Sequence, residues 1–260
     1  MKKIAILLLM VILILPTGCS VKNNSIKTNK TAVNSQKSSV SNSTGINYNI
    51  AKASYTDNGI KIDYPQITKL RDNHKQQKIN ELIKNEALEI INGYKESGNK
   101  FSLDITYKIK WKSSKILSIE YLGYANVTAG AHPSNIEFTT NIDINKGSSP
   151  KLNDIVNIDV SLSQKYKHGK YQPWSTDLNL ESAGVLNQVK DSLTSDDLIE
   201  QFQQKRAKFY FTKDSLGMSA DIAHVVGDHV EFEIPYQGRG SKIILEPSSR
   251  RSFINKFLFS

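Results

Sequence analysis

The sequence of 260 residues contains a single cysteine, Cys19. One cysteine cannot form a disulfide within the chain, and it excludes zinc sites built from paired cysteines. The sequence also lacks a glycine-rich phosphate-binding loop and a serine nucleophile elbow. Because no catalytic constellation is present, we expect a protein that is not an enzyme and that has no metal and no cofactor.

A long apolar segment is missing as well. The longest apolar run, residues 4–15, would span only about 18 Å as a helix, whereas a bilayer core is about 30 Å thick. It follows Lys2 and Lys3 and precedes Pro16-Thr17-Gly18-Cys19, an order typical of a bacterial signal peptide that ends at a lipobox-like site. An ordinary secretory signal with an incidental cysteine is the alternative. We predict that residues 1–19 are a lipoprotein signal peptide and that Cys19 is acylated, for example with palmitate.

The composition after residue 19 agrees with an anchored, exported protein. Seventeen of the 28 residues from 20 to 47 are Ser, Thr, Asn or Gln, which predicts a disordered polar linker. Without Lys2 and Lys3 the chain has 32 Lys and Arg against 25 Asp and Glu, a net charge of +7. This charge favours anionic headgroups or anionic wall polymers. We expect lipid anchoring to the outer face of the bacterial cell membrane and no nucleic-acid partner.

The folded part is expected to be α+β, with helices packed on antiparallel sheets in two successive subdomains, residues 48–147 and 148–260. Apolar residues at three- and four-residue spacing predict a helix over residues 79–94, and strict alternation predicts a strand over residues 101–109. Asp57-Asn58-Gly59 predicts a tight turn between two short strands. We also expect strands at 116–124, 136–144 and 230–235, a helix at 185–202, and a long loop at 163–184.

Two segments supply candidate ligand-binding residues. Pro133 holds His132 out of the helical region among small residues, so this histidine either contacts a ligand or fixes an irregular loop. Trp174 lies in a polar segment with Tyr171 and Lys170, and aromatic side chains beside basic ones suit glycan stacking or a protein hot spot. Alternatively, Trp174 only pins this loop to the body of the protein.

A third pattern bears on metal binding. His229, Glu231 and Glu233 occupy alternate positions of one predicted strand, so they share a face. Nitrogen and oxygen donors of this kind can hold a divalent metal. The solvated face of an amphipathic strand is the commoner explanation, and we adopt it.

A family resemblance adds to this interpretation. The segments Tyr64-Pro65-Gln66-Ile67, Ala129–Pro133 and Glu233-Ile234-Pro235-Tyr236 follow one another as in a known exported module. On these residues the chain resembles the two-part extracytoplasmic module of RsiV-type anti-sigma factors and of the non-catalytic N-terminal region of PdaC-type peptidoglycan deacetylases. The resemblance implies an α+β binding module of the cell envelope, which in RsiV-type proteins binds lysozyme. We expect neither control of a sigma factor nor deacetylation, because the chain has no cytoplasmic segment and no room for a deacetylase barrel.

These observations favour a non-enzymatic cell-surface lipoprotein that binds an envelope ligand and serves envelope-stress sensing or protection. The ligand would be a wall polymer, a glycan or a protein such as lysozyme. A net charge of +7 repels strongly basic lysozymes at long range. The alternative is a metal-dependent enzyme or an accessory factor acting on peptidoglycan, with His132 or the His229 face as its site.

Overall fold

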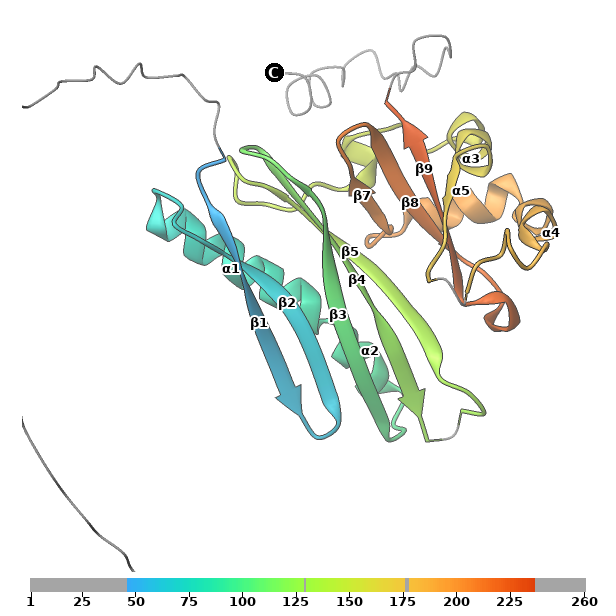
Figure 1. The fold of residues 1–260 in the computed structure, drawn as a ribbon, viewed down its shortest axis with the longest axis horizontal. Coiled ribbons are helices and arrows are strands. Elements are labelled where there is room, and N and C mark those ends of the chain that lie inside the picture. Colours follow the sequence, from blue (N-terminus) through green and yellow to red (C-terminus); the bar gives the residue numbers. More distant parts are fainter. Residues whose placement is uncertain (1–45, 129, 176–177, 237–260) are drawn as a thin grey trace, which may run out of the picture. The chain divides into compact units, whose positions relative to one another are not determined.

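The computed structural model describes residues 46–128, 130–175 and 178–236 (Figure 1). The predicted signal peptide, Cys19 and nearly all of the predicted linker lie outside these residues. No helix in the described part is long and apolar enough to cross a membrane. Two sheets and the helices packed on them confirm the predicted α+β class.

The first sheet has five strands, which lie side by side in chain order. They are β1 (Asn49–Asp57), β2 (Ile60–Thr68), β3 (Phe101–Lys112), β4 (Ile116–Val127) and β5 (Ser134–Asp143). The predicted turn between β1 and β2 is confirmed, because Asn58 and Gly59 have φ angles of 43° and 83°, as a two-residue hairpin turn requires. The expectation of purely antiparallel pairing is wrong for β2 and β3, which are parallel. Two helices carry the chain back between these strands, as parallel pairing demands.

Those helices are α1 (Asn73–Leu88) and α2 (Ile90–Glu96). The helical pattern was expected over 79–94, but α1 begins earlier, because the Asp72 carboxylate accepts a hydrogen bond from Lys75 N at 2.9 Å and caps the helix. Figure 1 shows α1 and α2 along one face of the sheet. The Asn80 side chain joins α1 to β2, because it accepts from Ile67 N at 2.7 Å and donates to Ile67 O at 2.9 Å.

The second sheet is antiparallel, with the spatial order β6-β9-β8-β7. Its strands are β6 (Lys170–Gln172), β7 (Phe209–Phe211), β8 (Ser215–Asp221) and β9 (His229–Pro235). It is accompanied by the helices α3 (Val160–Lys167), α4 (Leu186–Ser192) and α5 (Ser195–Gln203), and by the 3-10 turns η1 (Leu152–Asp154) and η2 (His224–Val226).

Two sequence expectations are corrected in this half of the chain. Residues 163–184 are not one long loop, because they contain the end of α3 and the strand β6. Residues 185–202 form two helices rather than one. The break falls at Thr194, whose hydroxyl accepts a hydrogen bond from Asp197 N at 3.1 Å and starts α5.

The two sheets are joined by buried hydrogen bonds. Ser118 of β4 donates to the side chain of Asn141 of β5, and Asn141 Nδ2 donates to Phe209 O of β7 at 2.7 Å. Phe211 N donates to Ser118 Oγ at 2.8 Å, and Phe209 N donates to Thr139 Oγ1 at 3.0 Å. Side chains of the first sheet therefore satisfy main-chain groups of β7, the edge strand of the second.

Candidate functional site

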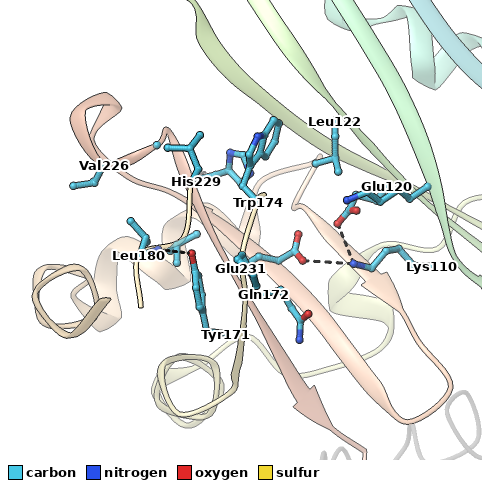
Figure 2. A pocket seen from close by; sticks show the side chains of 15 residues that line it. Lys110, Glu120, Leu122, Tyr171, Gln172, Trp174, Leu180, Val226, His229 and Glu231 are labelled. Atoms are coloured by element: carbon cyan, nitrogen blue, oxygen red, sulfur yellow. Dashed lines mark hydrogen bonds and ion pairs between the residues drawn. The ribbon is translucent and has the colours of Figure 1, made fainter. Parts of the chain in front are cut away.

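A cavity of about 130 Å³ lies where the two sheets meet (Figure 2). One wall comes from β3 and β4, and the other comes from β6, the segment after it and β9. We call it the inter-sheet cavity; its lining includes Lys108, Lys110, Glu120, Leu122, Tyr171, Gln172, Trp174, Leu180, His229 and Glu231. One water needs about 10–15 Å³ of such space, so the cavity has room for several waters or for a substituent of a larger ligand.

Lys110 is the central charge of the inter-sheet cavity. Its Nζ lies 3.2 Å from Glu120 Oε1 and 3.6 Å from Glu231 Oε1, as Figure 2 shows. The same Nζ lies 3.9 Å from the centroid of the Tyr210 ring. Burial alone would disfavour the ammonium, but Glu231 and Glu120 outweigh burial and raise the pKa of Lys110. Lys110 is therefore a fixed positive charge in the cavity wall.

Trp174 and His229 form the aromatic part of the wall. Their ring centroids are 4.6 Å apart in an edge contact, and Tyr124 contacts the indole from β4 at 6.0 Å. Burial is the main cause that lowers the pKa of His229 to about 4, so its imidazole is neutral at neutral pH. Tyr171 holds the segment in place, because its hydroxyl accepts a hydrogen bond from Leu180 N at 3.0 Å.

Two buried polar atoms of the lining have no partner. Gln172 Nε2 and His229 Nδ1 form no hydrogen bond with any of the residues that the structure describes. Leaving a buried donor or acceptor unpaired costs about 1–3 kcal/mol, so native structures rarely keep such atoms without a ligand or a water. Two residues of the lining thus keep unused hydrogen-bonding capacity, and one of them, His229, contacts the Trp174 ring.

Two carboxyls of this lining, Glu120 and Glu231, form a buried group with a third carboxyl, Glu137, and we call this group the glutamate cluster. One oxygen from each lies within 4.8 Å of the others. Tyr210 donates to Glu231 at 2.7 Å and to Glu233 at 3.1 Å. Burial, followed by the neighbouring Glu120, raises the pKa of Glu231, and burial raises the pKa of Glu137 to about 7. These two carboxyls hold protons far more readily than free glutamates do.

The structure places the predicted binding residues in two regions. Trp174 and Tyr171 line the inter-sheet cavity, whereas Lys170 is exposed and does not. His132 and Pro133 are exposed outside the cavity, and the His132 ring lies 6.4 Å from that of His224.

The strand that carries His229 and Glu231 differs from expectation. Both residues are only 8% exposed, so the expectation of a solvated face is wrong. Lys110, Glu120, Glu137 and Gln172 were missed altogether. The one signal for them was Glu120, a charge in the middle of an otherwise buried apolar strand.

The architecture defines a class of protein, an α+β module with two stacked sheets and a cavity where they meet. Residues 49–135 match the model of the family described as Deacetylase PdaC, which covers β1 to the first residues of β5 and supports a PdaC-type module in this part of the chain. No curated protein matches the chain.

Two solved structures of the DUF3298 family are similar to this chain. One, from Bacteroides fragilis, is 14% identical with a TM-score of 0.45, over 73% of this chain and 90% of that chain. The other, from Pseudomonas aeruginosa, is 13% identical with a TM-score of 0.44, over 74% of this chain and 93% of that chain.

Proposed function

We propose that this protein is an extracytoplasmic lipoprotein of the bacterial envelope that binds a wall glycan at the inter-sheet cavity and does not catalyse a reaction. The signal sequence ending at Cys19 and the match of residues 49–135 to Deacetylase PdaC support the envelope setting. The observation that carries the glycan is the unpartnered buried atom His229 Nδ1 on a ring that contacts Trp174, together with a second unpartnered atom of the lining, Gln172 Nε2.

The lining matches the chemistry of an amino sugar. A ligand site typically combines an apolar or aromatic wall with a few placed polar groups. An N-acetyl substituent fits the cavity volume, and its carbonyl oxygen accepts a hydrogen bond from Gln172 Nε2. Trp174 then covers the apolar face of the sugar ring. Charged groups at the mouth, such as Lys108, attract the acidic parts of a wall polymer.

Substitution of Trp174 tests this proposal. We expect Trp174→Ala to weaken binding of soluble N-acetylated wall fragments at least about tenfold, because an aromatic anchor in a binding site contributes about 2 kcal/mol. Isothermal titration calorimetry on the full chain in detergent, at low and physiological salt, measures the affinity. Lys170→Ala is the matched control, since Lys170 is exposed next to the cavity but does not line it.

The same calorimetric titration also distinguishes a glycan partner from a protein partner. If a folded Trp174→Ala variant binds the wall fragments with unchanged affinity, the glycan does not bind at the inter-sheet cavity. A lysozyme titrated in parallel is the second arm. Saturable binding of lysozyme without binding of wall fragments would make the partner a protein, whereas binding to whole wall that fades with salt would indicate general electrostatic attraction.

Lipid anchoring has its own test. We expect Cys19→Ala to move the protein from the membrane fraction to the soluble or secreted fraction and to remove the acyl mass seen by mass spectrometry. Ser20→Ala is the control, and this variant should keep both the acyl mass and the membrane location. A Cys19→Ala protein that stays in the membrane with unchanged mass would refute acylation at this cysteine.

A further inference from the structure

We infer that the glutamate cluster is a binding site for one hard divalent cation, Ca²⁺, Mg²⁺ or Mn²⁺, with Glu120, Glu137 and Glu231 as its ligands. The site uses other residues than the glycan contacts proposed above, although Glu120 and Glu231 line the same cavity. It joins the two sheets, because Glu120 and Glu137 come from β4 and β5 and Glu231 comes from β9.

The donor geometry suits a single ion. One oxygen from each carboxyl lies within 4.8 Å of the others, and ligands on opposite sides of a Ca²⁺ ion with bonds of about 2.3–2.6 Å are about 5 Å apart. All three donors are oxygens. Carboxylate oxygens select Ca²⁺, Mg²⁺ and Mn²⁺ over softer metals such as copper.

Unpartnered oxygens beside the cluster point independently to a ligand. Ser219 is 4% exposed, and its Oγ has no hydrogen-bond partner among the described residues. Ser219 is directly opposite Glu231 in the register of β8 and β9, so both side chains project from the same face. Its hydroxyl faces Glu137 and, as a hydrogen-bonding group, lowers the pKa of that carboxyl. A bound cation would be a further partner for Ser219 Oγ.

Glu137 shows the same lack of partners. Neither of its carboxylate oxygens accepts a hydrogen bond within the described part of the chain, although the residue is only 4% exposed. The nearest ammonium, Lys208 Nζ, is 4.0 Å away and is held at 2.5 Å by Asp221 instead. Buried carboxylates are normally paired or coordinate a metal. Glu137 is therefore the side chain with the most capacity left for an ion.

The charge of the glutamate cluster also calls for a cation. Lys110 is shared between Glu120 and Glu231, so one closely held ammonium serves three carboxyls. The negative charge that Lys110 does not balance is balanced by bound protons or by a bound ion. Metal binding releases protons from such ligands.

Two cavities adjoin the cluster. Glu120 and Glu231 line the inter-sheet cavity. Glu137 lines a second cavity of about 530 Å³ together with Lys208, Asp221 and His229. The Glu137 side chain itself is fully buried, so an ion enters the cluster through local opening of this lining.

Titration with the metals alone tests the site. The full chain in detergent, stripped with a chelator, is titrated at pH 7.5 with CaCl₂, MgCl₂ and MnCl₂ by calorimetry and by thermal unfolding. We expect one ion per chain for at least one of the three. At a hundredfold excess over Kd, the Tm should rise by about 5–10 °C.

Matched variants locate the ion. Glu137→Gln should weaken binding at least about a hundredfold, because a neutral amide replaces a charged ligand. Glu233→Gln is the control on the same strand as Glu231, and it should keep the affinity within about threefold because Glu233 is outside the cluster. Ser219→Ala is a second test variant, and it leaves the charge of the site unchanged. We expect it to weaken binding of the ion several-fold.

Two results would overturn the inference. One is the absence of heat and of any Tm shift with all three ions at pH 7.5. The other is a Glu137→Gln protein that binds the ion as the unchanged chain does. In the first case shared protons, rather than an ion, balance the charge of the cluster.

Discussion

Replacing Asn141 by leucine is expected to lower the free energy of unfolding by about 3–5 kcal/mol, since each buried polar group left unpaired costs about 1–3 kcal/mol. The substitution removes the acceptor of the Ser118 hydroxyl and the donor to Phe209 O. Both groups are buried between the sheets, where no solvent replaces the lost partner. Urea unfolding followed by circular dichroism measures the change.

Asn126→Leu is the matched control for this prediction. Asn126 is exposed on β4, so its replacement should change stability by no more than about 0.5 kcal/mol. The number of steps in the urea unfolding curve is informative as well. If the two sheets of the Asn141→Leu protein no longer unfold together, the curve will show two steps. If both variants unfolded at the same urea concentration, the hydrogen bonds between the sheets would not contribute to stability.

Gly123→Ala is expected to destabilise the protein by at least about 3 kcal/mol, at the upper end of what overpacking costs. A Cβ at this position would lie 2.1 Å from Asp104 O and 2.7 Å from Ile105 Cα. Both atoms belong to the backbone of β3, which is paired with β4 through this residue. Relief therefore requires the two central strands to separate. Thermal unfolding should show a Tm lower by at least about 6 °C.

Gly93→Ala supplies the control of opposite sign. A Cβ at Gly93 meets no atom within 4 Å, and the residue lies inside α2. Alanine stabilises a helix interior over glycine by about 0.5–1 kcal/mol. A Gly123→Ala protein with unchanged or higher Tm would contradict the close approach of β3 and β4.

Sequence patterns within one segment predicted the elements whose structure depends mainly on interactions within that segment. The alternation in β3, the apolar face of α1 and the turn at Asn58 and Gly59 are all visible in the sequence and are all present. The parallel pairing of β2 and β3 was missed because alternation shows which side chains are buried but not which strand is the neighbour. The strand β6 has three residues, too few for a period to be seen.

The site was harder to predict than the fold, for a related reason. Trp174 and Tyr171 were identified because aromatic and basic residues occur together in one polar segment. Glu120, Glu137 and Glu231 come from three strands in two different sheets, and neither the apolar strand around Glu120 nor the alternation around Glu231 indicates that the three residues meet. Only the docking of one sheet on the other makes them a cluster, and no pattern within a single strand encodes that docking.

The two walls of the inter-sheet cavity belong to different sheets, and this has a mechanical consequence. A molecule held there touches β3 and β4 on one side and β9 and Trp174 on the other, so it acts as a clamp. On the proposed function, a force that separates the sheets dismantles the binding site, and a bound ligand opposes that separation to the same degree, because the coupling of two equilibria is reciprocal. The resistance of this module to unfolding under force would then report whether its cavity is filled.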